Sequence, residues 1–134
     1  MKKLLFLLVL VNFILVVGCS GEKEVSKAPD SKDSMVSPSE GPLALPAESN
    51  PEANKHNEEG IDHWNQGHYD VALKHFNTAS KIDGSSGEVH FNEAISYDKE
   101  GQHGDATKHF KVAQQNANGN ALILESKILL AHVQ

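Results

Sequence analysis

The chain has 134 residues, which is enough for one small domain. Its 12 basic residues are all Lys, and against 18 Asp and Glu they leave a formal net charge of −6. An acidic chain without Arg is poorly suited to bind phosphate backbones, so we expect no nucleic-acid partner. A single Cys excludes an internal disulfide and any metal site built from several cysteines.

Residues 1–18 have the pattern of an export signal. Two Lys follow Met1, and an apolar run over residues 4–17 is interrupted only by Asn12. This run is shorter than the ~20 residues of a membrane-spanning helix, but it is typical of the apolar core of a secretory signal. We therefore expect a cleaved signal peptide, with a permanent membrane anchor as the alternative.

The signal ends in four residues that resemble the lipobox of bacterial lipoproteins: Val16, Val17, Gly18 and Cys19. The resemblance implies cleavage before Cys19, a diacylglycerol thioether on its sulfur and a fatty acyl chain, such as palmitate, on its freed amine. Several chains anchor a protein stably in a bilayer. Ser20 follows the cysteine, which by the same resemblance favours the outer membrane in a Gram-negative host. We expect a lipid-anchored protein of the bacterial cell envelope.

Residues 19–50 are expected to be the lipidated Cys and a disordered linker. They contain four of the five prolines, many Ser, Glu, Asp and Lys, and no aromatic residue. Such a composition buries too little apolar area to offset chain entropy. The simplest interpretation is a spacer that holds the following domain away from the membrane, and the alternative is a segment that binds a partner.

Residues 51–134 contain an internal repeat. Aligning residues 53–86 with residues 87–120, without a gap, gives nine identical pairs. The pairs are His56 and His90, Glu59 and Glu93, Ile61 and Ile95, Gly67 and Gly101, Ala72 and Ala106, Lys74 and Lys108, His75 and His109, Phe76 and Phe110, and Ala79 and Ala113. This period and pattern resemble the tetratricopeptide repeat (TPR).

The resemblance implies an all-α fold, a TPR-type solenoid of antiparallel helix pairs with two repeats and one C-terminal helix. Asn50 followed by Pro51 is a helix start, because Asn caps the free N–H groups and Pro fits the first helical position. Ser85 with Glu88 forms a capping-box pattern before the third helix. The expected helices are residues 51–66, 69–82, 86–100, 104–116 and 120–133.

The same resemblance implies a partner-binding groove along the first helix of each repeat. Trp64 is the favoured anchor, because indoles dominate binding hot spots. The alternative is that Trp64 and Phe91 pack against each other between the repeats. Of the positions that match a carboxylate clamp in this family, only Asn57 and Asn92 are suitable, so we expect an apolar or mixed ligand. The expected groove residues are Asn57, Ile61, Trp64, Phe91, Ile95 and Asp98.

Catalysis and metal binding receive little support from the sequence. The eight His include no pair three or four residues apart, which is the spacing that places two imidazoles on one helix face. We therefore expect half-buried packing histidines and no metal site, with a metal site assembled between helices as the alternative. No nucleophile elbow or glycine-rich phosphate loop is present. We expect no enzyme, no catalytic residue and no cofactor.

The last expected helix, residues 120–133, carries apolar residues around most of its circumference. One side can pack on the second repeat, and the opposite side would stay exposed, which soluble monomers avoid. We expect this helix to dock on a second copy, giving a possible homodimer, or on another protein. The alternative is a tail that folds back over the repeats. The expected self-association residues are Ile123, Leu124 and Leu130.

These features together favour a membrane-anchored TPR lipoprotein that acts as an adaptor or scaffold for a protein or peptide of the cell envelope. The alternative is a structural or assembly subunit that self-associates through its C-terminal helix. A His-dependent metal-binding lipoprotein is the least favoured of the three interpretations.

Overall fold

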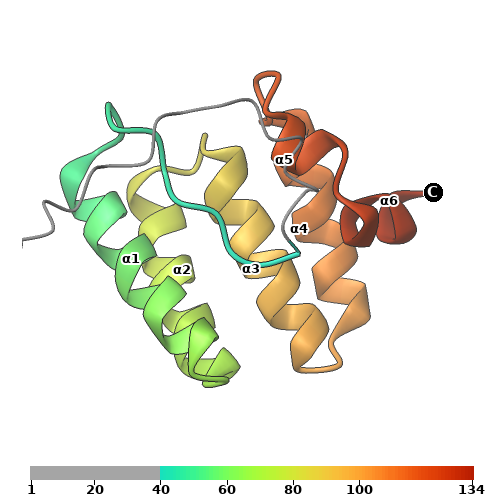
Figure 1. The fold of residues 1–134 in the computed structure, drawn as a ribbon, viewed down its shortest axis with the longest axis horizontal. Helices are drawn as coiled ribbons and strands as arrows, with labels where there is room; N and C mark the ends of the chain where they lie inside the picture. The colour runs from blue at the N-terminus through green and yellow to red at the C-terminus, as the bar shows by residue number, and fades with distance from the viewer. Residues whose placement is uncertain (1–39) are drawn as a thin grey trace, which may run out of the picture. The chain divides into compact units, whose positions relative to one another are not determined.

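The computed structural model describes residues 40–134 and shows them as an array of α-helices, without a strand in that range (Figure 1). The signal, Cys19 and the first part of the linker lie outside the described residues. The all-helical prediction is confirmed. Among the described residues, no helix combines the length and apolar character needed to cross a membrane. The helices are α1 (Pro51–Asn65), α2 (Tyr69–Ile82), α3 (Gly87–Lys99), α4 (His103–Gln115), α5 (Ala121–Leu124) and α6 (Lys127–Val133).

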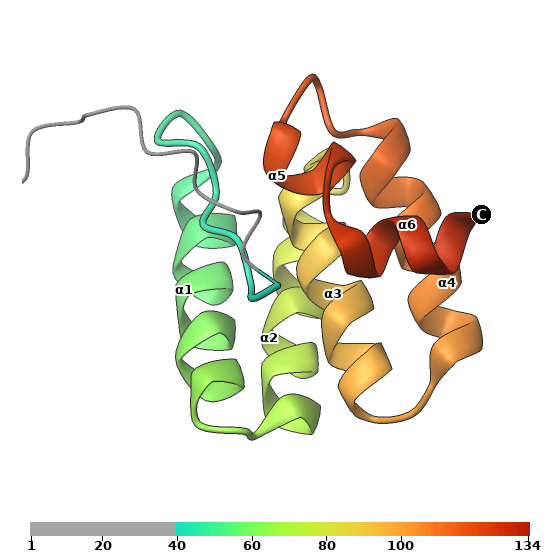
Figure 2. The same ribbon diagram turned by 45° about the vertical axis from the view of Figure 1, so that its right-hand side comes forward.

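The first four helices form two antiparallel pairs, α1 with α2 and α3 with α4, and α2 packs against α3 (Figures 1 and 2). Gly67 and Gly101 make the turn within each pair. Their φ angles are 81° and 74°, which glycine adopts without the steric cost that a Cβ atom brings. The equivalent positions of these two turns follow from the sequence repeat.

Small residues allow the paired helices to approach closely. A Cβ atom added at Gly60 would lie 2.5 Å from Cε1 of Phe76, so α1 and α2 could not keep this separation with a larger residue. Phe76 and its repeat counterpart Phe110 are fully buried. In each pair, a buried Phe from the second helix therefore packs against the first helix.

The helix starts agree with the sequence at α1 and differ at α3. Asn50 Oδ1 accepts hydrogen bonds from the backbone N–H groups of Glu52 at 2.9 Å and Ala53 at 3.3 Å. The predicted cap at Ser85 is wrong by one residue, because Ser86 Oγ accepts from the N–H of Val89 at 3.2 Å. The Ser85 hydroxyl instead donates a hydrogen bond to Oδ1 of Asp83 at 2.8 Å.

The predicted helix over residues 120–133 is wrong, because the chain breaks between α5 and α6. Ser126 caps α6 by accepting a hydrogen bond from the N–H of Leu129. The change of direction places both Ile123 and Leu129 in the core at 0% exposure. Apolar residues that would surround one straight helix are thus divided between two short ones, and most of them are covered.

Residues 41–45, here called the leading segment, do not form the disordered linker that was expected of them. Leu43 and Leu45 are buried, at 5% and 8% exposure. Leu43 joins the core cluster of α3 and α4, and Leu45 joins a second cluster with residues of α1, α2 and α3. Figure 2 shows the segment crossing the helices before it turns into α1. Two Leu in an otherwise Pro-rich run thus pack the segment against the domain.

Candidate functional site

Two asparagines hold the backbone of Leu43. Asn92 Oδ1 accepts from the N–H of Leu43 at 2.6 Å, and Asn92 Nδ2 donates to its carbonyl oxygen at 2.7 Å. Asn57 Nδ2 donates to the same carbonyl at 3.0 Å. These hydrogen bonds are made with the peptide groups of Leu43 and not with its side chain, as are the hydrogen bonds between β-strands. The contacts therefore depend on the backbone at this point and not on the identity of the side chain.

The orientation of both amides is fixed by their own contacts. Asn92 Nδ2 donates to Asn57 Oδ1 at 2.8 Å, so α1 and α3 are joined beneath the leading segment. Both Asn side chains are fully buried, and every one of these hydrogen bonds satisfies a group that would otherwise carry a desolvation penalty. Both asparagines lie on helices, Asn57 on α1 and Asn92 on α3.

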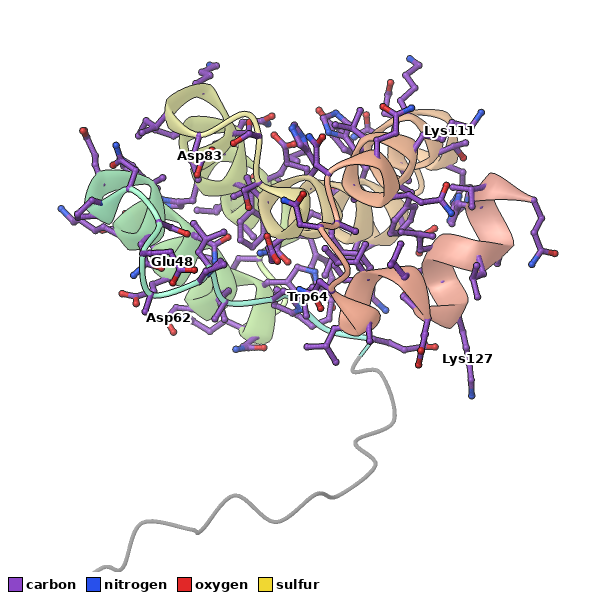
Figure 3. The ribbon with its side chains drawn as sticks, turned by 90° about the horizontal axis from the view of Figure 1, so that it is seen from above. Glu48, Asp62, Trp64, Asp83, Lys111 and Lys127 are labelled. Atoms are coloured by element: carbon purple, nitrogen blue, oxygen red, sulfur yellow. The ribbon has the colours of Figure 1, made fainter. Side chains whose placement is uncertain are left out.

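Apolar residues of the expected groove lie around the Leu43 side chain. Phe91 and Ile95 belong to the buried cluster that contains Leu43, and Trp64 packs against that cluster. The backbone at Gly41 also approaches Trp64, since a Cβ atom added there would lie 3.9 Å from Cζ3 of the indole. Figure 3 shows Trp64 next to the leading segment. Trp64 and Phe91 contribute to one cluster, in line with the packing alternative, and the chain itself covers it.

Six groove residues were expected, and the structure brings four of them to the leading segment: Asn57, Trp64, Phe91 and Ile95. Ile61 is half-buried and is not part of the clusters that hold Leu43 and Leu45. Asp98 is also half-buried, and its carboxylate contacts His103 and His132. Four of the six residues thus share one face with the leading segment, and the other two do not.

The expected self-association residues lie in three different environments. Ile123 is fully buried, Leu130 is half-buried, and Leu124 is exposed at 38%. Leu122, which was not selected, has the same exposure as Leu124. Ile123 cannot contact a second copy from its place in the core, so its assignment to a surface is wrong. The break at Ser126 is the physical reason, because it turns Ile123 inward.

A second kind of site appears twice, once in each repeat. In the second repeat, the Nδ1 atoms of His90 and His109 both lie 2.8 Å from Glu93 Oε2. In the first repeat, the corresponding atoms of His56 and His75 lie 3.3 and 3.2 Å from Glu59 Oε2. In each case the three ligand atoms lie within 4.8 Å of one another. Two imidazoles and one carboxylate thus converge between the paired helices of each repeat.

Glu93 is a carboxylate buried at 1% exposure. Burial raises its pKa, but the approach of His109 and hydrogen bonds from His90 and Ser80 outweigh this and lower the pKa to about 2. The hydrogen bond to Glu93 in turn raises the pKa of His90, although burial opposes it. The cluster therefore holds a negative charge in the interior and attracts a positive one.

A third cluster differs from the other two. Asp98 Oδ1 lies 2.9 Å from His103 Nδ1 and 3.0 Å from His132 Nε2. This cluster joins α3, α4 and α6. The first repeat has no equivalent, because Trp64 occupies the position that corresponds to Asp98. It belongs to the packing of the C-terminal helix and not to the repeat.

Sequence reasoning missed the repeated clusters because it compared histidines only with histidines. The spacing that matters joins a His to a Glu three residues later, as in His56 with Glu59 and His90 with Glu93. The third residue comes from the antiparallel helix, which no local spacing shows. The alignment of the two repeats nevertheless indicates the cluster, because all three of its positions are identical between the repeats.

No family model, curated protein or solved structure matches this chain.

Proposed function

We propose that the protein is a lipid-anchored adaptor of the bacterial cell envelope that binds an extended segment of another envelope protein across α1 and α3. The observation that carries the proposal is the recognition of the Leu43 backbone by Asn57 and Asn92. The TPR-like repeat supports a binding module, and the lipobox-like residues before Cys19 support the anchored location.

The chemistry of the face defines its ligand. The ligand is extended, so that one N–H and one C=O reach the paired amides, and it places an apolar side chain where Leu43 lies. Trp64 offers one further contact, because its Nε1 is buried without a hydrogen-bond partner. Such a donor carries a penalty of about 1–3 kcal/mol, which a carbonyl of a better-fitting peptide would remove.

The leading segment is a resident occupant of this face. Because it is tethered to α1, it competes with a free peptide at an effective concentration in the millimolar range. A partner must therefore bind more strongly than the segment, or bind when the segment has been drawn away. This competition makes the adaptor selective without requiring a second domain.

Competition between peptides tests the proposal. The full chain in detergent micelles is titrated with a fluorescent peptide of sequence Gly-Pro-Leu-Ala-Leu-Pro, which copies the leading segment. We expect Leu43→Ser to bind this peptide at least tenfold more tightly than the original chain does, since the face is released. Adding Asn92→Ala should abolish the gain. A folded Leu43→Ser chain with no affinity for the peptide contradicts the proposal.

Capture of the partner from membranes provides the second measurement. The Cys19-anchored protein is pulled down, and its partners are identified for the original chain and for Asn57→Ala with Asn92→Ala. The control is Lys111→Ala, on the exposed surface of α4 (Figure 3). We expect the asparagine variant to lose a partner that the control retains.

The second candidate function is assembly through α5, favoured by the exposure of Leu122 and Leu124. In that case Leu122→Ser with Leu124→Ser changes the sedimentation coefficient of the chain, and the asparagine variant does not. The two functions thus respond to different substitutions.

A further inference from the structure

We infer that the two repeated clusters, His56 with Glu59 and His75, and His90 with Glu93 and His109, each bind one divalent transition-metal ion of the zinc class. This inference is independent of peptide binding and concerns the interior of each helix pair.

The donor set and its spacing fit such an ion. Two imidazole nitrogens and one carboxylate oxygen are a common protein ligand set for zinc, with a fourth position left open. Bonds of 2.0–2.2 Å in tetrahedral geometry place ligand atoms roughly 3.3 Å apart. The nitrogen–oxygen distances of the first cluster are 3.3 and 3.2 Å. The corresponding distances in the second cluster are both 2.8 Å, so binding of an ion would lengthen them by about half an ångström.

The tautomer of His90 leaves its Nδ1 available as a ligand. His90 Nε2 lies 3.1 Å from the carbonyl oxygen of Gly84, which can only accept, so Nε2 carries a proton. In neutral His90 the lone pair of Nδ1 then faces Glu93 Oε2, another acceptor, at 2.8 Å. Either a proton on Nδ1 or a metal ion bound by both atoms resolves this pairing, and the metal ion uses Nδ1 as its ligand. An imidazole N–H held by a backbone carbonyl is also the usual outer contact of a metal-bound His.

Each cluster also contains a nitrogen without a hydrogen bond. His56 Nδ1 and His109 Nδ1 are buried and have no hydrogen-bond partner of acceptable geometry, although both face the carboxylate of their cluster. A metal ion accepts the lone pair of both nitrogens at once with that of the carboxylate. One ion therefore satisfies all three ligand atoms of a cluster.

Few other cations compete for the two carboxylates. Among the described residues, the ion-pair partners of Glu93 are His90 and His109. Glu59 has one further partner, Lys55, at 4.0 Å, and the Lys55 side chain is 71% exposed. An exposed pair at this distance contributes little and can be displaced. Among the described residues, Glu93 therefore has no Lys partner, and Glu59 has only this exposed one.

The choice of metal follows from the ligands. Imidazole favours zinc, nickel, cobalt and copper over magnesium and calcium, which prefer sites made of oxygen atoms alone. The ligands come from both helices of a pair, so a bound ion links α1 to α2 and α3 to α4. Three of the nine identities between the repeats are the three ligands of this site. The site is thus duplicated as a unit together with the repeat.

Zinc titration of the full chain in detergent micelles, stripped with a chelator and dialysed, tests the inference. Calorimetry gives the number of ions bound, and cobalt absorption shows whether imidazole and carboxylate ligands surround the ion in four-coordinate geometry. We expect His90→Ala with His109→Ala to remove one equivalent of zinc. His56→Ala with His75→Ala should remove another, and cobalt bands should weaken in step.

Two further variants keep the test decisive. Glu93→Gln has nearly the shape of the original residue and should weaken zinc binding at the second site at least tenfold, with an unchanged far-UV circular dichroism spectrum. His68→Ala is the control, because His68 is exposed and outside the clusters. A zinc stoichiometry that is unchanged in both double variants, or zinc binding that is lost only with His68→Ala, overturns the inference, as does an original chain that binds no zinc at 100 µM.

Discussion

The side-chain amide of Asn92 pairs with both backbone groups of Leu43, which lies 49 residues earlier in the sequence. This contact attaches the leading segment, which precedes α1 in the sequence, directly to α3. It also closes the largest loop for which a side-chain hydrogen bond is described. Its removal should therefore affect both the stability of the domain and the protection of one particular backbone amide.

Asn92→Ala is expected to lower the free energy of unfolding by about 1–3 kcal/mol, because it leaves the buried N–H of Leu43 without an acceptor. Urea unfolding measures the loss, and hydrogen exchange should show the Leu43 amide exposed. Asn54→Ala removes only an exposed side-chain contact to Glu58 and should change stability by less than about 0.5 kcal/mol. Full protection of the Leu43 amide in Asn92→Ala would show that the amide pairing is not what holds the segment.

Ile123 and Leu124 are neighbours whose substitutions should differ sharply. Ile123→Ala empties a fully buried position and should cost about 2–5 kcal/mol, whereas Leu124→Ala, at 38% exposure, should stay within about 0.5 kcal/mol. Thermal unfolding of the two variants provides the comparison. Equal effects would mean that residues 120–133 form one continuous helix, as the sequence alone predicts.

Gly60 and Gly104 form a second matched pair. Gly60→Ala places a Cβ atom against the Phe76 ring and should destabilise by about 1–3 kcal/mol, although Ala favours a helix. Gly104 lies in the first turn of α4 with no neighbouring atom within 4 Å of an added Cβ, so Gly104→Ala should stabilise by up to about 1 kcal/mol. Chemical denaturation distinguishes them, and a stabilising Gly60→Ala would contradict the close approach of α1 to α2.

The charge cluster at Glu93 predicts how the stability of the metal-free protein depends on pH. The pKa of Glu93 falls from 4.5 to about 2 on folding, so its contribution is present above pH 4.5 and is lost as the pH falls toward 2. The pKa of His90 rises above 6.5, so its contribution is present below pH 6.5 and is lost as the pH rises through the raised value.

Unfolding in the presence of a chelator, at a series of pH values, measures this effect. The difference in unfolding free energy between the original chain and Glu93→Gln should be largest between pH 4.5 and 6.5. The groups that face Glu93 are His90 on its own helix, His109 on α4 and the hydroxyl of Ser80 on α2. A difference that does not vary with pH would show that these histidines do not share the charge of Glu93.

The helical fold was predictable because its signals are local or repeated. Asn50 with Pro51 marks the start of α1, and the glycines at positions 67 and 101 mark the turns within each pair. The helix over residues 69–82 has the predicted bounds, because the 34-residue repeat fixes its register. These features depend on a few neighbouring residues, which sequence reasoning reads well.

The missed features depend on residues far apart. Nothing near Leu43 in its Pro-rich run indicates that Asn92 will bind it. At the end of the chain, one helix and two have the same apolar pattern, and the break at Ser126 places Ile123 and Leu129 in the core. His109 likewise reaches Glu93 only because two helices run antiparallel. The sequence therefore indicated several residues of the two sites, but not which of them come together in the fold.

The attachment at Leu43 also determines how the domain responds to a pulling force. Tension on the chain before residue 41 reaches the helices first at the Leu43 backbone, through three hydrogen bonds, and does not act directly on α1. Release of these hydrogen bonds together with the buried Leu45 side chain would free residues 43–50, which extend to at most about 26–29 Å. The helix pairs, held by their own cores, would remain folded. Pulling the leading segment away from the helices would thus lengthen the chain before α1 and uncover Asn57 and Asn92 in a single step.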